Sequence, residues 1–87
     1  MTRTPYSYPA RLEPDEDGRL VVHFPDLPEA LTDGADEVEA LTEASDCLST
    51  ALTARMVNDE DIPAPSRLRP WHYLVAPDAT MALKAAL

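Results

Sequence analysis

Hydrophobic and polar positions alternate along the first part of the chain, which is the pattern of β-strands that bury one face. In residues 6–13 the side chains expected on one face are Tyr6, Tyr8, Ala10 and Leu12. Residues 19–24 repeat this period, and the acidic turn with a glycine between the two segments predicts a β-hairpin. Proline has no backbone N–H donor, so Pro9 predicts that the first strand lies at a sheet edge or contains a bulge.

Two more short strands are expected further along the chain. The two prolines in residues 25–28 take the chain out of the sheet, and residues 29–32 return as a third strand before the Asp33-Gly34 turn. Beyond the Pro-rich loop at 62–70, the alternating residues 71–76 predict a fourth strand.

One long helix of about 20 residues is expected between the third and fourth strands. Asp36 is a favourable N-cap residue, and Glu39 completes a capping-box pattern three residues later. The apolar residues step by threes and fours and predict one core-facing stripe of Val38, Leu41, Ala44, Leu48, Ala51, Leu52 and Met56. The helix is expected to end at Asn58, ahead of Pro63 and Pro65.

Together these elements predict an α+β domain with the order β-β-β-α-β. The expected architecture is an antiparallel sheet with the long helix packed on one face, followed by a short C-terminal helix over residues 78–87. A helix on one side leaves the other face of the sheet available for contact with a partner.

The net charge of −9 narrows the range of partners. Sixteen Asp and Glu residues stand against seven Lys and Arg, so the surface repels nucleic-acid phosphates and anionic lipids and attracts basic proteins. Solubility of a small domain is the alternative explanation of this acidity. The 87 residues fit one domain. They contain no apolar run long enough to span a membrane and no secretory signal, so the expected location is the cytoplasm.

Nothing in the sequence predicts an enzyme, a metal site or a cofactor. Cys47 has acidic neighbours, not the electropositive surroundings of a nucleophilic thiol. The acidic run 15–17 is followed at once by a strand, unlike a calcium loop, and is interpreted as a solvated turn. The carboxylates otherwise concentrate in loops and on the helix, with Glu13 near a strand end, which argues against a two-metal nuclease. His23 and His72 lack the third, orienting group that acid–base chemistry needs.

Several short strings occur in an order that resembles the HicB-like antitoxin family. They are Tyr8-Pro-Ala10, Asp15-Glu-Asp-Gly18, Val22-His-Phe-Pro-Asp-Leu-Pro28, Leu31-Thr-Asp-Gly34, Glu39-Ala-Leu41 with Glu43-Ala44, and Ile62-Pro-Ala-Pro-Ser66. Each string alone is weakly specific, but the ordered set with these gaps is specific. The sequence departs from the family at Glu29-Ala30, where a Gly and a small residue are more common.

The resemblance implies a partial RNase H-like fold that lacks the nuclease carboxylates. It also implies an antitoxin that binds a small basic HicA-like toxin, an mRNA-cleaving protein, and covers the toxin's active site. Residues 1–77 are then the toxin-neutralising domain, and residues 78–87 begin a C-terminal helix. That helix is either the truncated entrance to a DNA-binding domain or the end of a short family member.

The residues expected to contact the toxin lie at the second strand's exit, on the helix and at the fourth strand: His23, Phe24, Asp26, Leu27, Glu37, Glu39, Glu43 and Trp71. A loop stiffened by two prolines would present Asp26 and Leu27 with little loss of entropy. The helix acids would pair with a basic partner, and Trp71 would be an anchor. Each residue has a structural alternative, because Leu27 and Trp71 also suit the core and the acids also suit a solvated face.

Two further expectations remain beside the antitoxin role. The alternative function is the oligomerisation half of a DNA-binding transcriptional autoregulator, with the DNA-binding part beyond this chain. These residues alone lack a basic face, so direct nucleic-acid binding is not expected. An exposed edge strand and an unfinished last helix predict a homo-oligomer, either a dimer or a tetramer.

Overall fold

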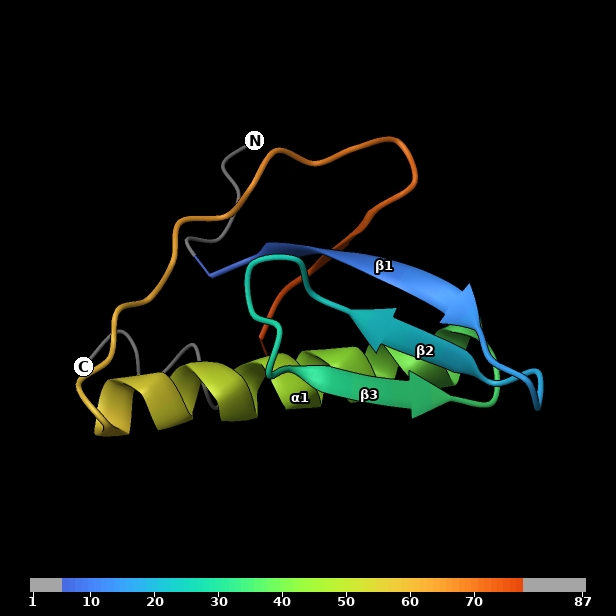
Figure 1. Cartoon of the computed structure of the whole chain (residues 1–87), viewed down its shortest axis with the longest axis horizontal. Coiled ribbons are helices and arrows are strands. Elements are labelled where there is room, and N and C mark those ends of the chain that lie inside the picture. Colours follow the sequence, from blue (N-terminus) through green and yellow to red (C-terminus); the bar gives the residue numbers. More distant parts are fainter. Residues whose placement is uncertain (1–5, 78–87) are drawn as a thin grey trace.

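A computed structural model describes residues 6–77 of the chain and shows an α+β domain built on a single four-stranded antiparallel sheet (Figure 1). The elements in chain order are β1 (Tyr8–Pro14), β2 (Leu20–His23), β3 (Leu31–Gly34), α1 (Glu37–Val57) and β4 (Tyr73–Val75). The fold class and the order β-β-β-α-β are therefore confirmed. The C-terminal helix expected over 78–87 lies outside the described residues.

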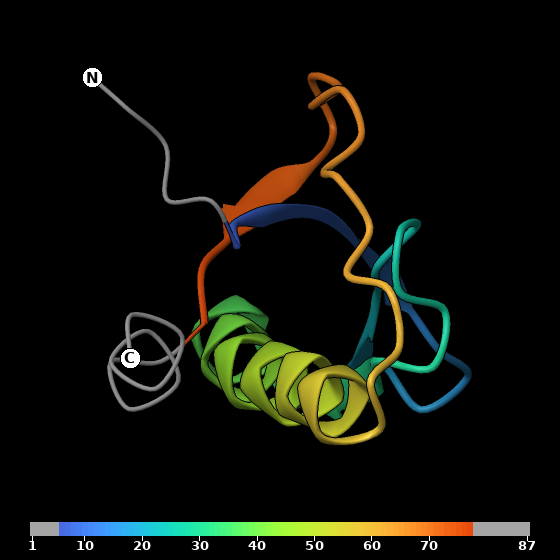
Figure 2. The ribbon, with the colours of Figure 1, turned by 90° about the vertical axis from the view of Figure 1, so that its left-hand side faces the viewer.

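The strand order in space is β3-β2-β1-β4, and each neighbouring pair is antiparallel. The first three strands form a meander, and α1 carries the chain from β3 at one edge to β4 at the other. Figure 2 shows the strands curving around the helix, so α1 lies against the concave face of the sheet. The expected packing of one long helix on one face is confirmed.

The position of β1 corrects the expectation drawn from Pro9. β1 lies between β2 and β4 and is not an edge strand. The ladder with β4 covers Tyr8–Ala10, whereas the ladder with β2 covers Arg11–Pro14. Pro9 therefore has a paired strand on only one side, which is the condition under which a strand tolerates a residue without an N–H donor.

The turn between β1 and β2 depends on one aspartate and one glycine. The Asp15 carboxylate accepts hydrogen bonds from the backbone N–H groups of Asp17 at 2.8 Å and Arg19 at 2.9 Å. Gly18 has φ +80°, a left-handed conformation that glycine adopts without steric cost. The acidic run is thus a closed turn whose first carboxylate serves the backbone, in agreement with the structural interpretation of residues 15–17.

The core lies between the concave face of the sheet and α1. Its buried hydrophobic residues are Tyr8, Ala10, Val22, Phe24, Leu27, Ala30, Ala40, Ala44, Leu48, Ala51, Leu52 and Val75. Tyr8, Ala10 and Val22 come from the predicted inward faces of β1 and β2. Ser7 and Pro9, expected on the opposite face of the first strand, are buried as well, so the alternation does not hold over residues 7–10. The third strand begins two residues later than expected because the turn at 27–30 is closed by the Ala30 N–H donating to the Leu27 carbonyl at 2.9 Å.

The buried face of α1 differs from the expected stripe at its two ends. Val38 is 77% exposed and Met56 36%, whereas Ala40 is fully buried. At the first turn, the position of Ala40 follows from the close approach of α1 to β3 at Gly34. A Cβ atom at Gly34 would lie 2.3 Å from the Ala40 backbone nitrogen, so only small residues fit at this crossing. Packing against β3 thus selects Ala40 over the larger Val38.

Candidate functional site

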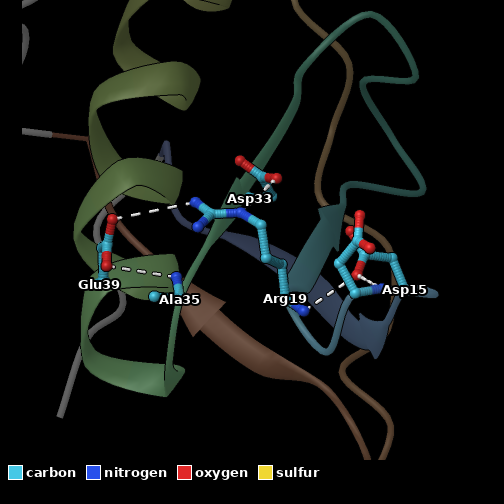
Figure 3. Close-up of polar contacts among 6 residues, drawn as sticks. Asp15, Arg19, Asp33, Ala35 and Glu39 are labelled. Atoms are coloured by element: carbon cyan, nitrogen blue, oxygen red, sulfur yellow. Dashed lines mark hydrogen bonds and ion pairs between the residues drawn. The ribbon is translucent and has the colours of Figure 1, made fainter.

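The first turn of α1 is held by a capping arrangement that uses two carboxylates. Asp36 is the N-cap residue, and its side chain accepts the Glu39 N–H at 2.9 Å. The Glu39 carboxylate reaches back past the N-cap to the Ala35 N–H at 3.2 Å (Figure 3). The predicted capping box therefore forms, shifted by one residue on its return side.

Arg19 joins this helix start to the sheet. Its guanidinium Nε donates to the Asp33 carboxylate on β3 at 3.0 Å, and its Nη2 lies 4.0 Å from the Glu39 carboxylate (Figure 3). The hydrogen bond to Asp33 raises the pKa of Arg19 above its ordinary value, with the charge of Asp33 adding to the effect. Glu39, a predicted toxin-binding residue, is thus occupied by contacts within the domain.

An acidic stripe continues along the solvent face of α1 from this point. We define the acidic stripe as Glu39, Glu43 and Asp46, which follow one another at spacings of four and three residues. Glu43 and Asp46 are exposed, and neither carboxylate makes a hydrogen bond or ion pair with any residue in the described range 6–77. Like charges at these spacings destabilise a helix, and α1 contains no cationic residue before Arg55.

Glu37 and Cys47 have local roles on the same helix. Glu37, another predicted contact, is exposed in the first turn and hydrogen-bonds Tyr73 of β4, which raises the pKa of the tyrosine. Cys47 is half-buried, and its burial, with the neighbouring Asp46 charge, raises the pKa of the thiol. A raised pKa disfavours the thiolate, which is the nucleophilic form of cysteine.

The loop that leaves β2 contributes side chains to the core and accepts hydrogen bonds from the Pro-rich loop before β4. Phe24 and Leu27, both predicted contacts, are buried in the core, which confirms the structural interpretation of Leu27. Asp26 is half-buried and accepts hydrogen bonds from the Ser66 N–H at 2.9 Å and from the Ser66 hydroxyl. Phe24, Asp26 and Leu27 therefore make their contacts within the domain.

A second set of polar contacts, made by Arg55, links the loop after β2 to the end of α1. The Arg55 guanidinium donates to both Glu29 carboxylate oxygens, at 2.6 and 3.0 Å, and to the Asp61 carbonyl at 2.9 Å. The hydrogen bonding of Arg55 to the Glu29 carboxylate lowers the pKa of Glu29 below its ordinary value. The Tyr8 hydroxyl donates to the Pro63 carbonyl at 2.5 Å, and burial raises the pKa of this tyrosine. The two Pro-containing loops are thus fixed against each other and the helix.

The remaining predicted contacts lie on the outside of the domain. His23 is half-buried in a row across the outer sheet face, paired with Arg11 on β1 and Leu31 on β3. Trp71 is 62% exposed and precedes β4, so the structural alternative that placed it in the core is wrong. The reason is the turn before β4, where the His72 N–H donates to the Arg69 carbonyl at 3.0 Å and leaves Trp71 outside the strand.

Sequence reasoning missed the arginines, which organise much of the polar structure. Arg19 and Arg55 link elements that are distant in sequence, and no local pattern indicates such partners. Arg67 and Arg69 are different, because residues 62–77 contain no Asp or Glu at all. The uneven distribution of charge along the chain would have singled them out.

Among residues 6–77 no group of three or more His, Cys, Asp or Glu side chains is arranged to hold a metal ion. In the same range, no helix has the length and apolarity required to cross a membrane. A shallow hollow of about 320 Å³ lies at the β3 edge beside Val21, Leu31, Thr32 and Asp33, and it contains no acid–base pair.

Comparison with known proteins identifies the class to which this fold and acidic surface belong. A family model described as the HicB-like antitoxin of bacterial toxin–antitoxin systems matches residues 7–86. The chain belongs to this HicB-like antitoxin family.

Individual relatives agree with that assignment. The chain is 38% identical over 80 residues to Antitoxin HicB of Escherichia coli K12, covering 92% of this chain and 58% of the relative. It is 50% identical over 58 residues to Antitoxin HicB 1 of Photorhabdus laumondii, covering 67% of this chain and 37% of that protein. The chain thus spans between about a third and three fifths of the length of these relatives.

Proposed function

We propose that this chain is the neutralising part of an antitoxin and binds a small basic HicA-like toxin in the cytoplasm, covering the toxin's active site. Membership of the HicB-like family supports a toxin partner. The observation that carries the proposal is the acidic stripe, in which Glu43 and Asp46 are exposed and have no hydrogen-bond or ion-pair partner in the described part of the chain. The proposed role is binding and requires no catalysis.

The arrangement of the stripe favours an external cation over simple solubility. A soluble helix surface gains stability when acids and bases alternate at spacings of three or four residues, because oppositely charged pairs attract. Here Glu43 has Glu39 four residues before it and Asp46 three residues after it. A basic partner would relieve this repulsion on binding and would be steered towards it by the net charge of −9.

The other predicted contacts divide according to their exposure. Exposed Glu37 lies at the start of the helix and extends the acidic surface, and exposed Trp71 is available as an apolar anchor. Phe24, Leu27 and Asp26 serve the interface indirectly, by holding the loop after β2 in one conformation. His23, on the outer sheet face, is the predicted contact for a toxin surface that extends beyond the helix.

The test is co-expression with the small basic protein encoded next to the gene. We expect co-purification and relief of the growth arrest that this protein causes. The double variant Glu43→Lys/Asp46→Lys should lose both, since it reverses the stripe. The matched control, Glu16→Lys/Asp17→Lys, makes the same change of charge at the tip of the β1–β2 turn and should retain both. Equal behaviour of the two double variants would refute the stripe as the binding surface.

A second candidate is the oligomerisation half of a DNA-binding autoregulator. The observation in its favour is that the chain covers only 37% and 58% of the length of its relatives. A gel-shift assay with the upstream DNA of the gene, using the chain and the full gene product side by side, tests it. Retardation by the full product alone would support this role.

A further inference from the structure

The charge of the chain is divided between two regions of opposite sign. Residues 6–61 contain fifteen of the acidic residues and three arginines, whereas residues 62–77 contain Arg67, Arg69 and His72 and no acid. We define the cationic segment as residues 66–71, which are all exposed. An isolated positive surface on a strongly acidic protein needs a physical explanation.

The arginines of the two regions also differ in their partners. Each arginine in residues 6–61 contacts a carboxylate: Arg11 with Glu13 at 2.6 Å, Arg19 with Asp33 at 3.0 Å, and Arg55 with Glu29 at 2.6 Å. Arg67 and Arg69 have no carboxylate within ion-pair distance anywhere in the described residues. Two guanidinium groups are thus not neutralised by any carboxylate of residues 6–77.

Apolar side chains lie between and beside these charges. Leu68, between the two arginines, is 40% exposed, and Trp71 is 62% exposed. Trp and Arg are the residues most enriched at the energetic centres of protein interfaces. Their combination within six exposed residues therefore indicates a contact surface with both charge and apolar area.

The cationic segment is fixed in place on both sides. Ser66 is bound through its N–H and hydroxyl to Asp26, and just upstream the Pro63 carbonyl accepts from Tyr8. At the other end the Arg69 N–H donates to the His72 Nδ1 at 3.0 Å, directly before β4. A surface that is already ordered loses less entropy on binding, so these contacts favour recognition.

The chemistry of the segment fits carboxylates presented by a protein surface. A nucleic acid would also meet Arg and Trp, but the charge of −9 repels an extended polyanion that runs beyond the segment. The acidic stripe of a second copy has the required features: it is compact, it faces solvent, and two of its carboxylates have no partner among residues 6–77. We propose that the cationic segment of one copy docks on the acidic stripe of a second copy.

The contact is between molecules because of where the two surfaces lie. Figure 2 shows residues 62–70 arching away from α1 towards β4. The stripe residues are exposed and are not among the α1 residues buried against the sheet. No ion pair joins the cationic segment to the stripe of the same chain. In a two-fold dimer the contact occurs twice, because each copy supplies both surfaces.

Self-association would also regulate the proposed toxin binding, since both use the acidic stripe. A toxin that occupies the stripe would displace the second copy, and the dimer would release its stripes as toxin accumulates. Self-association itself does not depend on the toxin proposal, and its test contains no toxin. The two proposals can therefore fail separately.

The test measures the molar mass of the purified full chain by sedimentation equilibrium over a range of protein and salt concentrations. We expect a reversible dimer that weakens as salt rises. Arg67→Glu/Arg69→Glu and Glu43→Lys/Asp46→Lys should each raise the dimer dissociation constant about tenfold or more, because each places like charges across the contact. Circular dichroism verifies that each variant remains folded.

Mixing the two double variants gives the decisive result. Each alone has like charges on both surfaces, but a mixed pair has opposite charges at both contacts, so we expect a 1:1 heterodimer. Glu16→Lys/Asp17→Lys should dimerise like the wild type. A monomeric wild type, a monomeric mixture, or wild-type dimerisation by the segment variant would overturn the proposal. Monomeric wild-type chain that binds single-stranded RNA through Arg67 and Arg69 would overturn it in favour of a nucleic acid.

Discussion

The two faces of α1 meet different physical demands. The inner face consists of small and aliphatic residues that fit the concave sheet, and at its closest point Ala40 lies against Gly34. The outer face carries the acidic stripe, in which Glu43 and Asp46 have no partner among residues 6–77 and the three carboxylates lie at repulsive spacings. The difference indicates that folding determines the sequence of the inner face, while an external partner is the best explanation of the outer one.

The arrangement of polar contacts follows the same division. Carboxylates that hold the domain together, such as Asp33, Glu29 and Asp26, each have a partner within hydrogen-bond distance. Those of Glu43 and Asp46 have none among residues 6–77. Substitutions on the inner face and at the paired carboxylates should therefore change stability, and substitutions on the stripe should change binding.

The largest effect is expected for truncation on the inner face. Leu48→Ala removes a fully buried side chain from the core and should lower the free energy of unfolding by roughly 3–4 kcal/mol. For a domain of this size that corresponds to a fall in the melting temperature of about 15 °C or more. Urea denaturation measures the change directly. Val57→Ala, a truncation on the exposed side of the helix, is the control and should change stability by less than about 0.5 kcal/mol.

A slightly smaller loss is expected where the helix crosses β3. Gly34→Ala places a methyl group 2.3 Å from the Ala40 backbone nitrogen, and the helix must move away. We expect a loss of roughly 2–3 kcal/mol. Gly18→Ala meets no atom within 4 Å but must adopt φ +80°, so it should lose only about 1 kcal/mol. Equal losses at the two glycines would show that the close crossing is unimportant.

The next largest change in stability is expected for loss of the Arg55–Glu29 ion pair, and this change should depend on pH. The pKa of Glu29 is lowered in the folded chain, mainly by the hydrogen bond from Arg55, so the folded state favours the ionised carboxylate. Its stabilisation is therefore complete above the ordinary pKa of 4.5 and is lost as pH falls through the lower folded value. Arg55→Gln should lower the melting temperature at neutral pH, and its difference from the wild type should shrink below pH 4.5. A difference in melting temperature that stays constant across this pH range would contradict a stabilising role for the Arg55–Glu29 ion pair.

Much of the fold was accessible from local sequence patterns. The β1–β2 hairpin, the helix cap at Asp36 and the end of α1 at Asn58 depend on residues close together in sequence, and each was predicted correctly. The exposure of Val38 and the interior position of β1 were not, because they depend on Gly34 and on β4, which are separated from them along the chain. Long-range packing has no signature in a local pattern.

In the candidate site, too, some features could be predicted from local sequence and others depended on distant contacts. The acidity of the helix was visible in the sequence. The sequence did not indicate which carboxylates have partners within the domain. Glu39 is held by Arg19, which comes twenty residues earlier, and Asp26 is held by Ser66. Only the structure separates these from Glu43 and Asp46. The exposure of Trp71 similarly follows from a turn that the strand pattern of 71–76 did not predict.

The smallest change in stability is expected for Glu43→Lys, which should nevertheless change the affinity for the toxin strongly. Glu43→Lys replaces two repulsive pairs, with Glu39 and Asp46, by attractive ones, so the free chain should gain about 0.5 kcal/mol. The same substitution should weaken toxin binding, because a basic partner then meets a cation at the centre of the stripe. Urea denaturation of the free chain and calorimetric titration with the toxin measure the two quantities on one variant. A gain in stability together with unchanged affinity would mean that the repulsion on the outer face serves solubility alone.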